Sequence, residues 1–203
     1  SSAASDVYKR QIMDPAEGWL ACGITGVGRL PEPEAIVDWL ESKMCSTNEL
    51  EGTTILVTAG GTQESIDPVR YIGNRSSGKM GYAIAEQAVR MGAKVILVSA
   101  PTSLPIPSGV DFISVDSAVS MQEAVEARYN DVNVVIMAAA VSDFRVLHKA
   151  EQKIKKMESM TIELVKNPDI LQGLGSKKNH QILVGFAAET EHVIKYGQDL
   201  SLI

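Results

Sequence analysis

Four stretches of the sequence are apolar at nearly every position, and they constrain the fold more than any other feature. Residues 54–58, 94–100, 133–141 and 181–188 are rich in valine, isoleucine and leucine or in alanine, without regular alternation with polar residues. A strand with one face in water alternates, whereas a strand covered on both faces of a parallel sheet does not. These stretches therefore predict the central strands of a layered sheet.

Helical patterns separate the predicted strands. Residues 79–91 and 118–129 carry apolar side chains at helical spacing, and further helices are predicted after Pro168 and from about Thr190. Shorter strands are predicted at residues 111–115 and 160–165. Because parallel neighbours need a crossover connection, this alternation predicts an α/β fold: a doubly wound, Rossmann-like, mostly parallel sheet.

The chain is predicted to have three parts. Residues 1–11 show no apolar periodicity and are predicted to be non-native or disordered. Residues 12–50 hold a glycine-rich stretch, a short amphipathic helix opened by Pro33, and a polar linker. The alternating pattern occupies residues 51–203.

Composition excludes several classes of protein. The net charge of −6 leaves no basic surface for a polyanion, so no nucleic-acid partner is expected. The apolar run from Val134 to Val141 is far shorter than the roughly 20 residues that cross a bilayer, so no membrane partner is expected. Two cysteines, Cys22 and Cys45, suggest neither a disulfide scaffold nor a zinc site, and they fit a reducing cytoplasm.

The loop after the first strand of the sheet is about twenty residues long, which is typical of a functional loop. It leads into the helix predicted at residues 79–91, and its glycine, serine and asparagine side chains are Gly60, Gly61, Asn74, Ser76, Ser77 and Gly78. Exposed N–H groups at a helix N-terminus attract anions. The loop matches neither the dinucleotide-binding pattern G-x-G-x-x-G nor the P-loop pattern. The alternative to an anion site is a purely structural role, in which the glycines form turns and Ser77 caps the helix.

Two further segments follow strand ends on the same predicted edge. In AAAVSDF, small residues allow a flat base or ribose to approach, and Asp143 can accept hydrogen bonds; the alternative is plain sheet core with a capping aspartate. Lys153–Lys156 holds three lysines that suit a triphosphate, or else form a solvated charged face.

Five motifs in order carry a family resemblance: ILVTAGGTQESIDPVRYIGNRSSGKMG, AAAVSDFR, KIKK, LVKNPDIL and VGFAAET. They closely resemble phosphopantothenate–cysteine ligase, the C-terminal half of the bacterial bifunctional coenzyme A biosynthesis enzyme. The resemblance runs from about Thr53 to the end of the chain. It implies that CTP activates 4'-phosphopantothenate as an acyl-cytidylate, which L-cysteine then attacks, releasing CMP.

The resemblance also assigns residues. It implies that Asn74 holds the acyl-cytidylate, that Lys153 meets the triphosphate and that Arg70 belongs to the substrate loop. Phosphate is expected at Ser76, Ser77 and Gly78, and the cytidine at Ala139, Ala140, Asp143 and Phe186. Gly60 and Gly61 are expected to belong to the same nucleotide- and substrate-binding loop. Mg²⁺ is expected with the nucleotide, without named protein ligands.

The upstream stretch WLACGITGVGRLPEP resembles the end of the flavin-dependent phosphopantothenoylcysteine decarboxylase. Cys22 then matches the catalytic cysteine of that lyase, and FMN is expected only in a full-length parent. The resemblance further implies a homodimer through the synthetase domain, a C-terminal truncation at Ile203 and a flap shortened to residues 157–159.

Two alternatives stay open at this point. One is a nicotinamide-dependent Rossmann oxidoreductase, suggested by TAGG and the alanine-rich strand; however, no tyrosine is followed by lysine four residues later. The other is a catalytically incompetent nucleotide-binding fragment, which would bind nucleotide without turnover.

Overall fold

The computed structural model describes residues 15–19, 25–29, 31–33, 35–37, 48–156 and 158–186. The chain divides into two compact units, Ser1–Ser46 and Thr47–Ile203. In the first unit, β1 (Ala16–Trp19) pairs antiparallel with β2 (Thr25–Arg29). The Ile36 N–H donates to the Glu32 carbonyl at 3.1 Å, an i to i−4 bond within the short helix predicted there.

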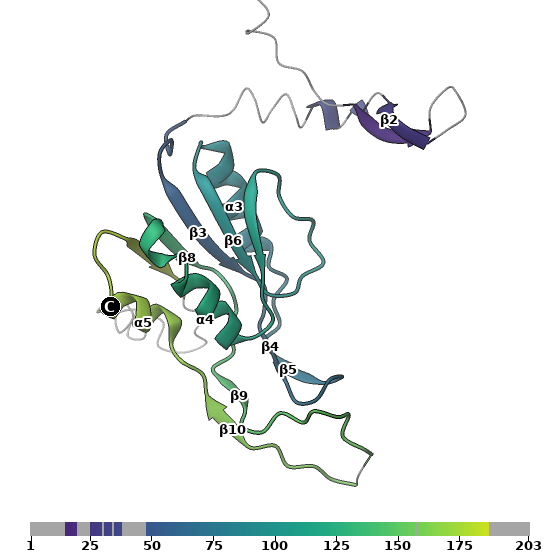
Figure 1. The fold of residues 1–203 in the computed structure, drawn as a ribbon, viewed down its shortest axis with the longest axis vertical. Helices are drawn as coiled ribbons and strands as arrows, with labels where there is room; N and C mark the ends of the chain where they lie inside the picture. The colour runs from purple at the N-terminus through teal and green to yellow at the C-terminus, as the bar shows by residue number, and fades with distance from the viewer. Residues whose placement is uncertain are drawn as a thin grey trace, which may run out of the picture. The chain divides into compact units, whose positions relative to one another are not determined.

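The second unit is built on a five-stranded sheet in the order β11-β8-β3-β6-β7, in which every pairing is parallel (Figure 1). Its strands are β3 (Thr54–Ala59), β6 (Lys94–Ser99), β7 (Val110–Ser114), β8 (Val134–Met137) and β11 (Ile182–Gly185). Each coincides with a predicted strand. The central strands β3 and β6 are buried from their second residue onward, as their continuous apolar sequences require.

Helices cover both faces of this sheet. On one face, α3 (Lys79–Arg90) packs its Tyr82 and Ala85 against Val57 and Leu97 of the strands. On the other face lie α4 (Ala118–Glu126), the 3₁₀ helix η1 (Tyr129–Asp131) and α5 (Ile170–Ser176). Successive residues of a strand point to opposite faces, so β3 contributes to both layers. The predicted doubly wound, Rossmann-like α/β fold is confirmed.

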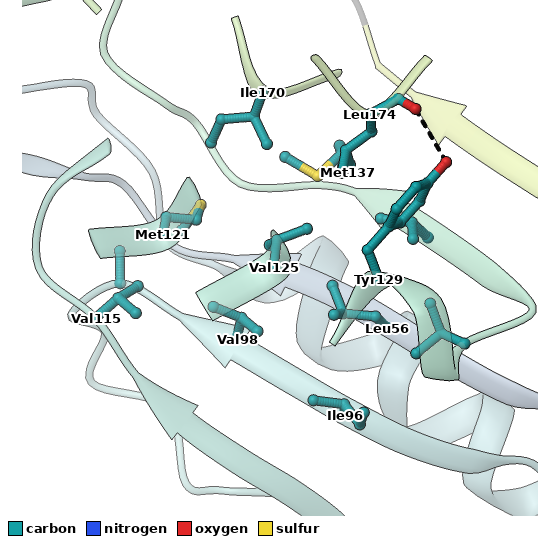
Figure 2. Packing of buried hydrophobic residues seen from close by; sticks show 13 residues of the cluster. Leu56, Ile96, Val98, Val115, Met121, Val125, Tyr129, Met137, Ile170 and Leu174 are labelled. Atoms are coloured by element: carbon teal, nitrogen blue, oxygen red, sulfur yellow. Dashed lines mark hydrogen bonds between the residues drawn. The ribbon is translucent and has the colours of Figure 1, made fainter. Parts of the chain in front are cut away.

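The second apolar layer is closed by a buried tyrosine. Figure 2 shows Leu56 and Val98 from the sheet beneath Val125 of α4, and Tyr129 reaching across to α5. The Tyr129 hydroxyl donates to the Leu174 carbonyl at 3.0 Å. Burial raises the pKa of the Tyr129 hydroxyl, so it stays a neutral donor at physiological pH.

Several predicted boundaries are wrong. The strand predicted over residues 133–141 ends at Met137, because Ala139 donates its N–H to the Thr58 hydroxyl (3.1 Å) and leaves the ladder. The helix predicted over residues 118–129 ends at Glu126 and gives way to η1. Of the strand predicted over 160–165, only β10 (Leu164–Lys166) forms. The helix predicted from Thr190 lies outside the described residues.

None of the three small antiparallel pairs among the described residues was predicted, neither β1–β2 nor the two pairs of the second unit. The loop after β3 contains β4 (Gln63–Ser65) paired with β5 (Tyr71–Gly73), and β9 (Phe144–Val146) pairs with β10 outside the main sheet (Figure 1). Strands of three residues are too short for a period-two pattern to emerge. Among the helices that the structure describes, none combines the length and apolarity needed to cross a bilayer.

Candidate functional site

The order in which the chain adds strands to the sheet reverses between β3 and β8, and the carboxyl ends of these two strands lie side by side. The chain runs outward from β3 through β6 to β7 and then returns to β8 on the other side of β3. In open α/β sheets, such a switch point is where ligands bind. The Ala140 N–H donates to the Gly60 carbonyl at 2.8 Å, and the Thr62 N–H donates to the Ala140 carbonyl at 3.2 Å. These bonds join the two predicted ligand segments.

Two buried threonines fix the segment after β8. The Thr58 hydroxyl accepts from the Ala139 N–H at 3.1 Å, and the Thr62 hydroxyl accepts from the Ser142 N–H at 2.9 Å. Both threonines are wholly buried. They were missed in the sequence, where their only signal is a pair of hydroxyls in an otherwise apolar strand end.

The glycines of the loop after β3 are needed for its own packing. Gly60 has a φ of 79°, and a Cβ there would lie 2.6 Å from the Ala100 carbonyl oxygen. A Cβ on Gly61 would lie 2.7 Å from the carbonyl oxygen of Asn74. Gly60 therefore allows close packing against the segment after β6, and Gly61 allows the Asn74 segment to lie close to the end of β3.

The N-terminus of α3 is open. Its N-cap is Gly78, which has a φ of 75° and no side chain, so the helix begins one residue after the predicted cap Ser77. The Ser77 hydroxyl nevertheless accepts from the Lys79 N–H at 3.5 Å. The Ser76 hydroxyl accepts from the Gly78 N–H at 3.3 Å, while Ser77 is exposed. A helix N-terminus with exposed hydroxyls is electrostatically suited to an anion.

Asn74 is exposed, and its side chain reaches the segment after β8. Its Nδ2 donates to the Val141 carbonyl at 3.2 Å. This hydrogen bond joins positions 67 residues apart in the chain. The loop after β3 and the AAAVSDF segment therefore meet at one edge, as predicted.

A cavity of about 310 Å³ opens beside that segment. Among its lining residues are three of the predicted cytidine residues, Ala139, Asp143 and Phe186. Val141, the acceptor for Asn74, lines it too. The predicted residue Ala140 is not part of this lining, nor are Asn74 and Lys153.

Asn167 is a lining residue that the sequence interpretation missed. It is buried, and its Nδ2 donates to the Ser142 carbonyl at 2.8 Å while its own N–H donates to the Asp143 carbonyl at 2.7 Å. Arg145 donates from Nη1 to the Asn167 Oδ1 at 3.1 Å. Asn167 thus fixes the backbone that carries Asp143. Its sequence signal is the polar pair Asn-Pro directly after a strand.

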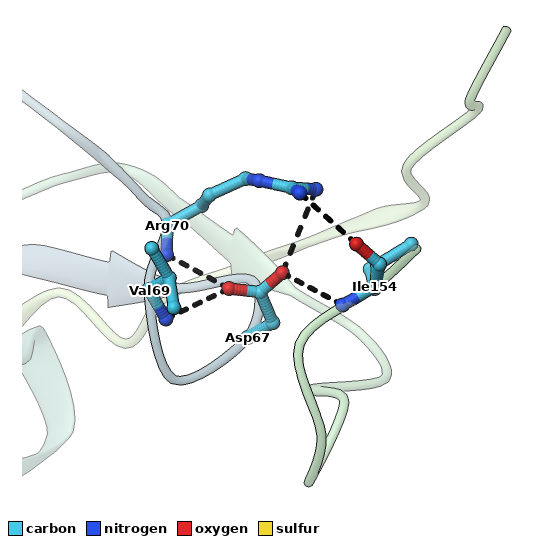
Figure 3. A network of polar contacts seen from close by, with 4 residues as sticks. All are labelled: Asp67, Val69, Arg70 and Ile154. Atoms are coloured by element: carbon cyan, nitrogen blue, oxygen red, sulfur yellow. Dashed lines mark hydrogen bonds and ion pairs between the residues drawn. The ribbon is translucent and has the colours of Figure 1, made fainter. Parts of the chain in front are cut away.

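A second polar network lies in the loop after β3, between β4 and β5 (Figure 3). The Asp67 Oδ1 accepts from the N–H groups of Val69 and Arg70, each at 2.8 Å, and its Oδ2 accepts from the Ile154 N–H at 3.1 Å. The Arg70 Nη1 lies 3.5 Å from Oδ2, and Nη2 donates to the Ile154 carbonyl at 3.0 Å. Lys153 directly precedes Ile154 and is exposed.

The charge state of Asp67 follows from these contacts. Burial works to raise the pKa of its carboxyl, but the N–H groups of Val69, Ile154 and Arg70, with the nearby guanidinium, outweigh burial. The pKa is therefore held below its ordinary value, and the carboxylate is ionised at neutral pH. Asp67 was missed in the sequence, where its only signal is an Asp-Pro pair of the kind that is common in turns.

The prediction for Cys22 stays untested. Cys22, predicted as a remnant of a lyase site, lies outside the described residues. Within the described ranges, no three His, Cys, Asp or Glu side chains are close enough together to hold a metal ion.

Comparison with known proteins identifies similar sequences and folds. The family model described as DNA/pantothenate metabolism flavoprotein C-terminal domain matches residues 50–201. The coenzyme A biosynthesis bifunctional protein CoaBC of Bacillus subtilis strain 168 is 50% identical over 191 residues, covering 92% of this chain and 47% of that protein. CoaBC of Escherichia coli K12 is 46% identical over 192 residues, with coverages of 92% and 47%.

A solved structure of a similar protein has a similar fold. The C-terminal domain of coenzyme A biosynthesis bifunctional protein CoaBC superposes with a TM-score of 0.67 and 51% identity. The match covers 75% of this chain and 72% of that one. The chain spans about half the length of the two relatives named above.

Proposed function

This chain belongs to the family of DNA/pantothenate metabolism flavoprotein C-terminal domains, and from that premise we propose that it is a ligase of coenzyme A biosynthesis. The reaction we propose joins 4'-phosphopantothenate to L-cysteine, with CTP as the activating nucleotide. Its products are phosphopantothenoylcysteine, CMP and pyrophosphate. Family membership favours this ligation over the nicotinamide-dependent oxidoreductase.

The observation that carries the proposal is the hydrogen bond from Asn74 Nδ2 to the Val141 carbonyl, at 3.2 Å. It brings an exposed amide to the rim of a cavity that Val141 itself lines. An amide is a neutral donor, and it can exchange its backbone acceptor for a ligand oxygen without a change in charge. Asn74 is therefore suited to hold the acyl-cytidylate between the two steps.

The cavity supports a nucleoside. Ala139 is small enough to let a flat ring approach, and Asp143 is an exposed carboxylate that can accept from ribose hydroxyls or an exocyclic amine. Phe186 is 51% exposed and offers an aromatic face to a base. A volume of about 310 Å³ falls in the usual range for small-ligand pockets.

The phosphates are proposed to lie outside that cavity, over the N-terminus of α3. Ser76, Ser77 and the N–H groups around Gly78 would donate hydrogen bonds to the phosphate oxygens, and Gly60 and Gly61 allow the loop to pack closely there. Lys153 and Arg70 supply positive charge, and the Arg70 side chain keeps 38% of its surface exposed despite its bonds to Asp67 and Ile154. Such groups offset the charge that develops in phosphoryl transfer.

The chemistry needs little acid–base machinery. A carboxylate oxygen of 4'-phosphopantothenate bonds to the α-phosphorus of CTP, and the bond from that phosphorus to the bridging oxygen breaks, releasing pyrophosphate. The cysteine amine then bonds to the acyl carbon, CMP leaves with the former carboxylate oxygen, and the amine proton passes to solvent. What the protein must supply is alignment of the two substrates and compensation of charge.

Three further predictions remain proposals. Mg²⁺ would accompany the triphosphate, whose oxygens are ligands that Mg²⁺ prefers. The relatives are named bifunctional. We propose FMN binding and the decarboxylase (lyase) activity only for a longer parent protein that contains Cys22. A homodimer is supported by apolar side chains exposed on and beside the β9–β10 pair, namely Phe144, Leu147, Met160 and Leu164.

The test is pyrophosphate release from CTP with 4'-phosphopantothenate and cysteine, repeated with ATP, GTP and UTP. We expect CTP to be preferred, and we expect Asn74→Ala to lose the cysteine-dependent step. Equal release from all four nucleotides, or release without the pantothenate compound, would remove the assignment. CTP binding without turnover would support the incompetent nucleotide-binding fragment, and tight NADPH binding would support the oxidoreductase.

A further inference from the structure

The side chain of Asp67 is wholly buried, although it is ionised. A buried carboxylate is costly unless its oxygens are fully hydrogen-bonded. Here both oxygens are used: one accepts two N–H groups of its own turn, and the other accepts the N–H of Ile154, 87 residues away (Figure 3). The distant contact distinguishes Asp67 from a residue that only shapes a local turn.

The segment that contains Lys153 is tied to the Asp67 turn at two points. The Ala150 N–H donates to the Ile66 carbonyl at 2.9 Å. At Ile154, the N–H donates to Asp67 and the carbonyl accepts from Arg70, at 3.1 and 3.0 Å. Lys153 lies between these anchors, directly before the second one.

Little else that the structure describes holds this segment. Residues 149–156 form neither helix nor strand, and they contribute to neither of the two apolar clusters of the sheet. The lysines at 153, 155 and 156 are exposed, and Ile154 is only partly buried. A segment with few apolar contacts opens easily unless hydrogen bonds restrain it.

We infer that Asp67 is a positioning residue, which fixes the backbone of Lys153 relative to the loop that carries Arg70 and Asn74. The inference rests on the proposed function in one respect, that Lys153 meets the triphosphate. Asp67 itself touches no substrate in this account. By holding the backbone of Arg70 and the backbone beside Lys153 together, it limits how far apart these two cationic side chains can lie.

The first experiment measures hydrogen exchange of the Ile154 amide by NMR in the wild type and in Asp67→Asn. The asparagine amide has a single acceptor oxygen, which the two N–H groups of its own turn would take, so the Ile154 N–H should lose its acceptor. Its exchange is expected to speed by about tenfold or more, while the amide of Leu56 in β3 stays protected. Asp116→Asn is the matched control. Hydrogen bonds from Ser120 and Ser117 also lower the pKa of Asp116. The hydrogen bonds that the structure describes for the Asp116 side chain do not involve residues 149–156.

Unchanged exchange at Ile154 in Asp67→Asn would overturn the inference. If Asp67→Asn also exposes Leu56, the chain has unfolded globally, and Asp67→Glu replaces it. Glutamate keeps the charge but moves the carboxylate by one methylene. Faster exchange at Ile154 alone in Asp67→Glu would support the inference, and protection equal to the wild type would contradict it.

The second experiment is a double-mutant cycle on kcat/KM for CTP in pyrophosphate release. Asp67→Asn alone is expected to lower kcat/KM by about 10- to 100-fold, as for the loss of a charge-assisted hydrogen bond. In a Lys153→Gln background the same change should cost less than about threefold, because its route through Lys153 is already lost. An equal fold-loss in both backgrounds would mean that Asp67 does not act through Lys153, and it would overturn the inference.

The two experiments separate the inference from the proposed function. If the wild type releases no pyrophosphate from CTP, the proposed function fails. The exchange rate of Ile154 then decides by itself whether Asp67 holds the lysine segment.

Discussion

The interior of the sheet and the loops at its carboxyl edge are stabilised in different ways. In β3, Leu56 and Val57 are wholly buried among apolar side chains from both helical layers. At the edge, the buried groups are polar: Asp67, Thr62 and Asn167 each hold a neighbouring segment by hydrogen bonds. Apolar burial is non-directional and insensitive to pH, whereas the edge depends on individual bonds with fixed geometry.

This difference teaches where stability and function should separate. Loss of an interior side chain removes apolar contacts between the sheet and a helical layer, so the free energy of unfolding and the activity should decrease together. Loss of an edge contact frees one loop and leaves the sheet intact. The predictions below test that division, beginning with the largest expected effect on stability.

Leu56→Ala is expected to lower the free energy of unfolding by about 3 kcal/mol, because it leaves a cavity between β3 and the α4 layer. Urea denaturation measures the change. Ile106→Ala is the control, since that side chain is 55% exposed and its loss should cost less than about 0.5 kcal/mol. Similar losses in the two variants would contradict the account of the interior.

Gly60→Ala is expected to cost about 2 kcal/mol, from its left-handed φ and the contact with the Ala100 carbonyl. Gly52→Ala is a matched control, because Gly52 has the same φ of 79° with nothing within 4 Å of a Cβ. It should cost only the conformational part, about 1 kcal/mol. Equal costs at the two glycines would show that close packing of the loop contributes nothing.

The stability contributed by Asp67 should depend on pH in one direction. Its pKa is lowered in the folded state, so the contribution is fully present above the ordinary carboxyl value of about 4 and is lost as pH falls through the lower folded value. The difference in unfolding free energy between the wild type and Asp67→Asn should therefore be constant near neutrality and shrink in acid. A difference that grows in acid would refute the assigned charge state.

Asn74→Ala should have the smallest effect on stability, below about 0.5 kcal/mol, because it removes one exposed hydrogen bond. Its effect on ligation should nevertheless be large. Thermal denaturation and product formation, measured on the same preparation, separate the two. Asn179→Ala removes another exposed amide and should change neither. A stability loss in Asn74→Ala as large as in Gly60→Ala would break the comparison.

The sequence predicted the interior better than the edge, for a physical reason. Continuous apolar runs such as Ile55–Val57 and Val95–Val98 mark buried parallel strands by themselves. The three-residue strands β4, β5 and β9 leave no such pattern and went unpredicted, while β10 was predicted too long and without its partner.

The edge was predictable only in part. Strand ends of a parallel sheet share one edge, so the meeting of Asn74 with Val141 and the grouping of Ala139, Asp143 and Phe186 could be anticipated. The partners of single buried polar groups could not. No local signal connects Asp67 to Ile154, since that bond exists only once the chain has folded.

The most direct test of the central claim, that the carboxyl edge activates a carboxylate with CTP, is isotope exchange. Labelled pyrophosphate is supplied with CTP and 4'-phosphopantothenate while cysteine is withheld, and the label entering CTP is measured. The account predicts label in CTP, much less in ATP, GTP or UTP under the same conditions, and none without the pantothenate compound. Label that enters all four nucleotides equally, or enters CTP without 4'-phosphopantothenate, would contradict it.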